Sequence, residues 1–192
     1  MTICAIVPVR SLADGKRRLA GVIDDAQRAA LNERFLVHAL GLAAALPGPT
    51  ILVSPDPAVA AHPAAGNAVR VVDPGRGLNA AIETGRDRAR RAGAERIVVL
   101  PTDLPTARRE DVLALAAAGS AVAIAPDRRR QGTNGLSVAA GLDLAFRFGA
   151  GSFAAHLAEA ERLGVAPDVI ENPRLALDID TPEDWRHWRE NA

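Results

Sequence analysis

The chain has 192 residues, of which 23 are Lys or Arg and 23 are Asp or Glu, so its formal net charge is zero. A balanced chain has no bulk charge that would draw it to nucleic acid or anionic lipid, and we expect neither as a partner. The single cysteine, Cys4, provides neither a disulfide framework nor a cysteine-based metal site. No run approaches the roughly 20 apolar residues of a membrane span. We therefore expect a soluble, cytoplasmic protein that folds as a single domain over residues 1–192.

Short runs rich in Val and Ile are typical of buried strands. They predict strands at Ile3–Val9, Ile51–Val53, Val69–Val72, Ile97–Leu100, Val122–Ala125 and Leu175–Ile179. Apolar residues at helical spacing predict helices that include residues 31–42 and 78–89, and further helices are expected at 110–118, 152–163 and 182–190. Strands and helices alternate, so the predicted fold class is α/β, with a mostly parallel twisted sheet flanked by helices.

Ligands of open α/β sheets bind beyond the carboxyl ends of the strands, which directs attention to the segments that follow them. The segment after the first strand, residues 8–18, is a basic loop that contains Gly15 and the only lysine of the chain, Lys16. Such a loop could wrap phosphate oxygens, although on this segment alone a solvated basic turn is the favoured interpretation. In residues 73–79, two glycines allow close backbone approach, and Asn79 could either cap the next helix or contact a base edge.

Three aspartates in two segments indicate a metal site. Asp103 lies between Pro101 and Pro105 after the most apolar predicted strand, where a carboxylate can bind Mg²⁺ or merely cap a turn. Asp178 and Asp180 are two residues apart on a predicted strand, so they should share one face. Because adjacent like charges are unfavourable without a compensating cation, we predict that these carboxylates and Asp103 form a metal site.

Two further segments could hold an anionic substrate. Residues 127–135 combine three consecutive arginines with a flexible loop, and residues 148–152 lead through glycines into a helix at Ser152. Free amides at that helix N-terminus and the Ser152 hydroxyl would form a phosphate site. The alternatives are that the arginines form a solvated surface and that Ser152 is a simple N-cap. The four histidines show no metal-ligand spacing, and no Ser or Cys has a nucleophile-elbow context, so covalent hydrolase chemistry is not expected.

The combination of these segments is more specific than any one of them. The motifs are Pro8-Val9-Arg10, Gly15-Lys16-x-Arg18-Leu19, Gly77-Leu78-Asn79, Leu100-Pro101-Thr102-Asp103-Leu104-Pro105, Gly132-Thr133-Asn134, Phe148-Gly149-x-Gly151-Ser152-Phe153 and Asp178-x-Asp180-Thr181-Pro182. Their order over nearly the whole chain resembles the phospholactate or phosphoenolpyruvate guanylyltransferases of deazaflavin coenzyme biosynthesis. The sequence departs from the expected pattern at Arg10, Thr102 and Ala150, where Lys, Ala and Pro are common.

This resemblance implies a nucleotidyltransferase fold related to the sugar-nucleotide enzymes, with GTP as a substrate, Mg²⁺ as the cofactor and a small phosphorylated acid as the second substrate. It implies that Lys16 and Asp103 are catalytic and that Asp103, Asp178 and Asp180 hold the metal. The residues that it places at the nucleotide are Pro8, Val9, Arg10, Lys16, Gly77, Leu78, Asn79, Pro101 and Thr102. Those that it places at the acceptor are Thr133, Asn134, Gly149 and Ser152.

Two other functions remain open from the sequence. A molybdenum-cofactor or sugar nucleotidyltransferase would share the fold, but it usually carries a Gly-Gly loop where this chain has Pro8-Val9-Arg10. A non-catalytic guanine-nucleotide-binding protein would keep the pocket without turnover, which the retained aspartates argue against. The sequence does not distinguish phosphoenolpyruvate, 2-phospholactate and 3-phosphoglycerate as acceptors, and it leaves the oligomeric state open, a homodimer included.

Overall fold

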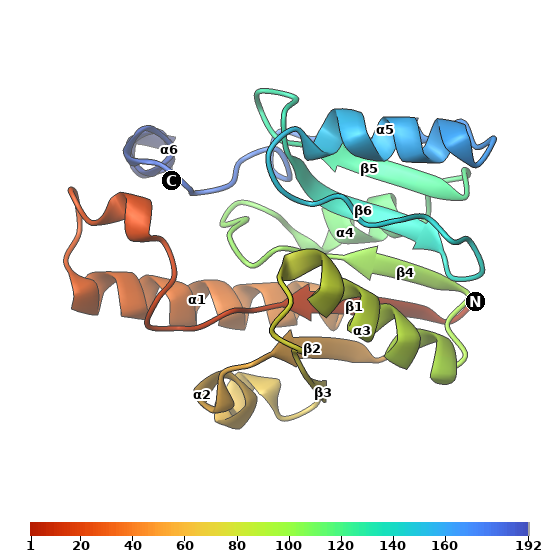
Figure 1. Ribbon diagram of the computed structural model, residues 1–192. Helices are drawn as coiled ribbons and strands as arrows, with labels where there is room; N and C mark the ends of the chain where they lie inside the picture. Colours follow the sequence, from red (N-terminus) through yellow and green to blue (C-terminus); the bar gives the residue numbers. More distant parts are fainter. Residues whose placement is uncertain (192) are drawn as a thin grey trace.

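The computed structural model describes residues 1–191 and contains a seven-stranded sheet in the order β3-β2-β1-β4-β6-β5-β7 (Figure 1). The strands are β1 (Ile3–Pro8), β2 (Thr50–Ser54), β3 (Val69–Val72), β4 (Arg96–Val99), β5 (Val122–Pro126), β6 (Thr133–Ala139) and β7 (Asp168–Val169). The α-helices are α1 (Asp25–Ala43), α2 (Pro57–Ala61), α3 (Leu78–Arg91), α4 (Arg109–Ala116), α5 (Ser152–Arg162) and α6 (Pro182–Asn191). Two short 3-10 helices are η1 (Arg17–Leu19) and η2 (Pro63–Ala65).

The first four strands, β1 to β4, form a parallel block in which β1 pairs with β2 and β4, and β2 pairs with β3. Cys4, Ala5 and Ile6 of β1 are fully buried, because helices cover the block on both faces. Strand β5 is also parallel to β7. The predicted α/β class and mostly parallel sheet are therefore confirmed.

Strand β6 corrects the predicted flexible loop at residues 131–135. It runs antiparallel to both β4 and β5, and its residues from Thr133 to Val138 are buried. Asn134 and Gly135 are of types depleted in strands, which concealed it in the sequence. The tertiary structure accommodates both residues, because Asn134 Nδ2 donates to Leu175 O (3.0 Å) and a Cβ at Gly135 would lie only 2.7 Å from Leu115 Cδ2.

The predicted strand at Leu175–Ile179 is wrong. This segment has no continuous strand partner and makes isolated backbone bonds, from Arg128 N to Ala176 O (3.0 Å) and from Ile179 N to Asp103 O (3.2 Å). Burial nevertheless alternates along the segment as it would in a strand, since Leu177 and Ile179 are buried and Asp178 between them is only partly buried.

Helices cover both faces of the sheet. Buried residues of α1 and α4 join one core cluster, whereas those of α3 and α5 join a second cluster across the sheet, in agreement with Figure 1. The predicted helices are therefore present at these positions, together with α6. Within residues 1–191, none of the helices has the length and apolarity needed to span a membrane.

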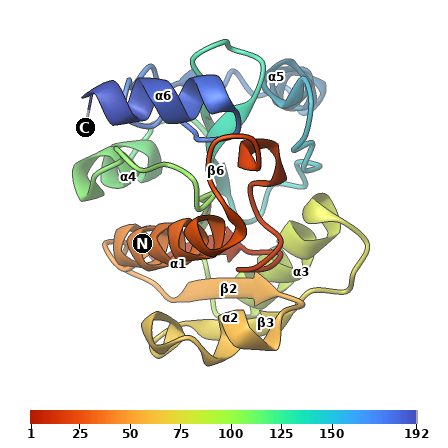
Figure 2. The ribbon, with the colours of Figure 1, turned by 90° about the vertical axis from the view of Figure 1, so that its left-hand side faces the viewer.

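A third apolar cluster lies beyond the sheet, where β1 and β4 end. It joins Leu19 beside η1, Phe35 of α1, Leu177 and Ile179, and Trp188 of α6. In Figure 2 the loop with η1 lies beside α6 at this edge. The cluster therefore anchors two segments that carry predicted site residues, the Lys16 loop and residues 177–180.

Candidate active site

Three neighbouring hollows follow the edge of the sheet at which the parallel strands end. The β1–α3 hollow has a volume of about 430 Å³, the loop hollow about 320 Å³ and the α5 hollow about 480 Å³. Arg10 lines the first and second, Arg18 and Asp180 line the second and third, and Leu78 lines the first and third. The shared residues make the hollows one continuous site.

The β1–α3 hollow contains most of the residues predicted to face the nucleotide. Pro8, at the end of β1, lines it together with Val9 and Arg10, which follow the strand, and Gly77 and Leu78 line it from the start of α3. Gly77 has φ +94°, and a Cβ built there would meet nothing within 4 Å. Because this conformation favours glycine and the backbone is open, a flat ligand could approach the main chain closely here.

Asn79 and Thr102 depart from the expected arrangement, since neither is among the residues of 1–191 that line the three hollows. The N-cap of α3 is Gly77, so the capping role considered for Asn79 is wrong. Its side-chain amide donates to Phe148 O (3.1 Å), and its Oδ1 accepts from Phe148 N (2.8 Å). Asn79 therefore ties the start of α3 to the loop before α5.

Lys16 connects the loop hollow with the acidic residues. Its Nζ donates to Asp180 Oδ1 (2.7 Å) and also pairs with Asp103. The residue has a left-handed backbone (φ 56°, ψ 38°), which is uncommon outside glycine and typical of functional sites. Burial opposes the charged ammonium, but the two carboxylates more than offset it and raise the pKa of Lys16 above its ordinary value.

The three predicted aspartates all line the α5 hollow. Burial, followed by the charges of Asp103 and Asp180, raises the pKa of Asp178 to about 6, although a bond from Asn134 Nδ2 to Asp178 Oδ1 (3.2 Å) opposes the shift. Lys16 thus compensates only part of a local triple negative charge.

Oxygen ligands with excess negative charge suit Mg²⁺ chemically. In residues 1–191, however, no group of three His, Cys, Asp or Glu side chains is arranged to hold a metal ion. The Lys16 ammonium bonds both Asp103 and Asp180, so a cation bound by both would have to displace it.

The α5 hollow also contains every residue predicted to hold the acceptor, namely Thr133, Asn134, Gly149 and Ser152, together with Pro101. Gly149 and Gly151 have positive φ angles of 130° and 71°, which turn the chain tightly into α5. Gly151, not Ser152, is the N-cap of α5, so the interpretation of Ser152 as a simple N-cap is wrong. Ser152 is the first helical residue and is buried against the hollow.

The arginine run has structural partners. Arg128 pairs with Asp184 (2.8 Å), Arg129 with Glu183 (2.9 Å), and Arg130 with Glu171. The three arginines therefore connect the turn between β5 and β6 to α6 and to residue 171 through ion pairs. Arg129 also lines the α5 hollow.

His156 is the residue that sequence reasoning missed. It is fully buried on α5 and its Nδ1 lies 3.0 Å from Thr133 Oγ1. Metal-ligand spacing was the wrong criterion for it. The available signal was its position, one helical turn after Ser152 on the apolar face of the predicted helix.

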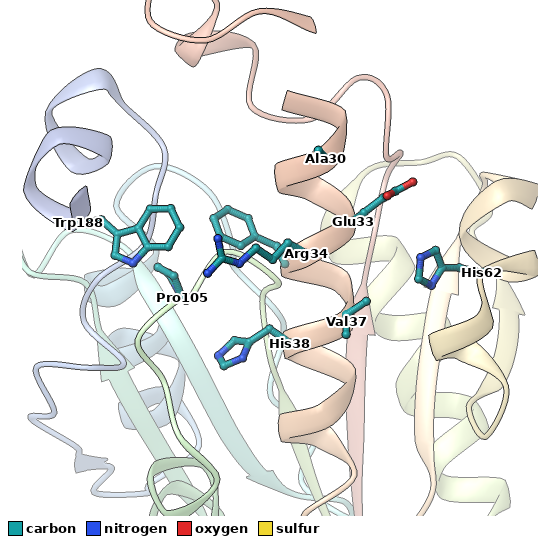
Figure 3. A pocket seen from close by; sticks show the side chains of 9 residues that line it. Ala30, Glu33, Arg34, Val37, His38, His62, Pro105 and Trp188 are labelled. Carbon is teal, nitrogen blue, oxygen red and sulfur yellow. The ribbon is translucent and has the colours of Figure 1, made fainter. Parts of the chain in front are cut away.

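A larger hollow of about 540 Å³ lies elsewhere, between α1, Pro105 and α6. Figure 3 shows Arg34 extending from α1 toward Trp188, over whose ring its guanidinium lies 5.6 Å from the centroid. His38 Nε2 lies 3.0 Å from the Ala107 carbonyl oxygen. This hollow contains none of the predicted site residues, and we assign the chemistry to the continuous site.

Comparison with protein families gives a match over residues 3–187 to the model described as "Guanylyl transferase CofC like". A phosphoenolpyruvate guanylyltransferase of Rubrobacter xylanophilus is 42% identical over an alignment of 188 residues, with 96% of this chain and 92% of that protein covered. A 3-phospho-D-glycerate guanylyltransferase of Phenylobacterium zucineum is 38% identical, with 94% and 86% of the two chains covered.

Solved structures agree on the fold. A nucleotidyl transferase from Methanothermobacter has a TM-score of 0.70 at 19% identity, covering 99% of this chain and 97% of that one. A 4-diphosphocytidyl-2C-methyl-D-erythritol synthase has a TM-score of 0.65 at 16% identity, covering 98% and 97%. The expected nucleotidyltransferase fold is therefore confirmed.

Proposed function

Because this chain belongs to the family of CofC-like guanylyl transferases, we propose that it moves the GMP group of GTP onto a phosphorylated three-carbon acid and releases pyrophosphate. The names of its relatives favour phosphoenolpyruvate or 3-phosphoglycerate as the acceptor, and 2-phospholactate shares their chemistry. The product would serve deazaflavin coenzyme biosynthesis in the cytoplasm.

The observation that carries this proposal is the position of Lys16. Its ammonium lies in contact with Asp103 and Asp180, where the loop hollow meets the α5 hollow. A nucleotide in the β1–α3 hollow would extend its phosphates past Arg10 toward Lys16. An acceptor phosphate in the α5 hollow would approach the same junction from the other side.

The reaction follows from this placement. An oxygen of the acceptor phosphate attacks the α-phosphorus of GTP in line, the bond to the β-phosphate oxygen breaks, and pyrophosphate leaves with that electron pair. A phosphate monoester has a second pKa near ~6 and is mostly ionised at neutral pH, so no general base is required. Lys16 neutralises charge on the triphosphate, and the two hollows supply positioning.

We also propose that Asp103, Asp178 and Asp180 hold Mg²⁺ during the reaction. The ion would neutralise triphosphate charge and polarise the transferred phosphoryl group. The pKa of Asp178 is raised by burial and then by the charges of Asp103 and Asp180, and a bound cation would relieve the repulsion among these carboxylates, which supports this set. Release of Lys16 from Asp103 and Asp180 would free its ammonium for the phosphates.

The test is pyrophosphate release from each of the four common nucleoside triphosphates, with Mg²⁺ or with EDTA, against each of the three acids. We expect release with GTP, one acid and Mg²⁺ only. Release with another nucleotide would point to a different nucleotidyltransferase. Silence across the panel with GTP still bound would indicate a non-catalytic nucleotide-binding protein.

A further inference from the structure

The buried imidazole of His156 is bonded at both ring nitrogens. Its Nε2 lies 3.0 Å from the backbone nitrogen of Arg147, and its Nδ1 lies 3.0 Å from Thr133 Oγ1. A backbone N–H can only donate, so Nε2 must accept. The two contacts join β6, α5 and the loop before α5 through one side chain.

These contacts fix the tautomer. A neutral imidazole carries one proton, and because Nε2 accepts, that proton must be on Nδ1. An imidazolium would direct a second N–H at the Arg147 amide. Burial lowers the pKa of His156 to about 4, since the favourable charge of Glu159 does not compensate for it and Arg147 opposes protonation. The ring is therefore neutral at pH 7.

The direction of the Thr133 hydroxyl follows from the tautomer. Nδ1–H donates to Thr133 Oγ1, so the hydroxyl must direct its own proton away from the ring. Thr133 lines the α5 hollow with Gly149 and Ser152, and no second side-chain partner for its hydroxyl occurs within residues 1–191. The proton is then available to a ligand in that hollow.

We propose that His156 is a positioning residue, which orients the Thr133 hydroxyl as an obligatory donor to the phosphate of the acceptor in the α5 hollow. This inference rests on the proposed function in placing the acceptor there. A fixed donor suits the ionised oxygens of the acceptor phosphate, which can only accept hydrogen bonds and which include the nucleophile.

His156 also supports the loop that closes this hollow. Its ring meets Phe148 edge-on with centroids 4.8 Å apart, and its Nε2 accepts from Arg147. Loss of the side chain could therefore raise the acceptor KM merely by loosening residues 147–151. The experiment must separate the Nδ1 contact from the Nε2 contact.

Two conservative variants make that separation. The amide of His156→Gln can reach the Nε2 position and accept from Arg147, but it leaves Thr133 without a donor. The shorter amide of His156→Asn reaches the Nδ1 position and keeps a donor for Thr133, at the expense of the Arg147 contact. We expect His156→Gln to raise the acceptor KM about tenfold with kcat and the GTP KM nearly unchanged, and His156→Asn to stay within about threefold of wild type.

A double-mutant cycle with Thr133→Val provides the second readout. Thr133→Val alone should raise the acceptor KM about tenfold, and adding His156→Gln to it should change the KM no further, because the two residues act through one hydroxyl. Additive effects, or a larger KM for His156→Asn than for His156→Gln, would assign His156 to core packing alone and overturn the proposal.

Two measurements do not depend on catalysis. Long-range ¹H–¹⁵N NMR spectra should show a proton on Nδ1 only, without titration between pH 5.5 and 8; a proton on Nε2 overturns the proposal. Titration with inorganic phosphate should show equal losses of affinity in Thr133→Val and His156→Gln. If the wild type shows no turnover but the NMR and phosphate-binding results are as expected, the proposed function fails and the His156 inference stands. Unequal losses of phosphate affinity in the two variants would reject the inference.

Discussion

The two halves of the sheet present their parts of the site in different ways. In the parallel half, the β1–α3 hollow is formed largely by backbone and apolar groups, such as Pro8, Val9 and Gly77. In the half built on β6, the α5 hollow is surrounded by side chains that bond one another, as in the Thr133–His156 and Asn134–Asp178 pairs. The shape of the β1–α3 hollow therefore depends on the path of the main chain, whereas that of the α5 hollow depends on a hydrogen-bond network. Single substitutions should therefore affect the two hollows through different mechanisms.

The largest effect is expected at Asp103, where the halves meet. Asp103→Asn should lower kcat about 10³-fold or more, because several kcal/mol of charge stabilisation are lost and each 1.36 kcal/mol is tenfold. Steady-state pyrophosphate release measures this. Asp25→Asn, at a side chain that is 94% exposed on α1, is the matched control and should retain full activity. Activity of Asp103→Asn within tenfold of wild type would remove Asp103 from the catalytic set.

The second effect concerns the stability of the half built on β6. The folded pKa of Asp178, about 6, lies above its ordinary value of 3.8, so the folded state binds the proton more tightly and loses stability as pH rises through this window. In metal-free protein, Asp178→Asn should raise the free energy of unfolding by about 1–3 kcal/mol above pH 6, with the gain disappearing toward pH 4. Urea unfolding in EDTA at several pH values measures it. A less stable variant at pH 7.5 would contradict the charge argument.

The third prediction tests the β1–α3 hollow of the parallel half. Gly77→Ala introduces strain of about 1–3 kcal/mol at a positive φ and should raise the GTP KM about tenfold without changing the acceptor KM. Gly93→Ala is the control, since Gly93 also has a positive φ (76°) and open space around it but lines none of the three hollows among residues 1–191. Equal effects of both variants on the GTP KM would mean that global strain, not the hollow, is responsible.

The smallest effect is expected at Ser152. Ser152→Ala should raise the acceptor KM about three- to tenfold with little change in kcat, because a contact made in both ground and transition states affects binding. Ser120→Ala, which removes a hydroxyl bonded to the Ala166 carbonyl away from the site, provides the control. An acceptor KM for Ser152→Ala equal to that of wild type would leave the serine with a packing role only.

The strands were predicted correctly in the parallel half of the sheet and less well in the half built on β6. Strands β1, β2 and β4 of the parallel block were predicted because near-continuous apolar runs mark strands buried on both faces, and the edge strand β3 was predicted from its valines alone. The polar strand β6 was missed, and the apolar segment 175–179 was predicted as a strand although it only fills two core clusters. Apolar periodicity reports burial, whereas a strand also requires a free edge with which to pair.

The sequence by itself determined the α/β class, the family and the set of polar residues beyond the strand ends, because these depend on local pattern and on short motifs. Only the tertiary structure decided that Lys16 bonds Asp103 and Asp180, that Asn79 bonds Phe148, and that His156 bonds Thr133. Each of these contacts joins residues at least 23 positions apart. Their geometry is set by how sheet and helices pack, and no local pattern encodes the direction of a buried hydrogen bond.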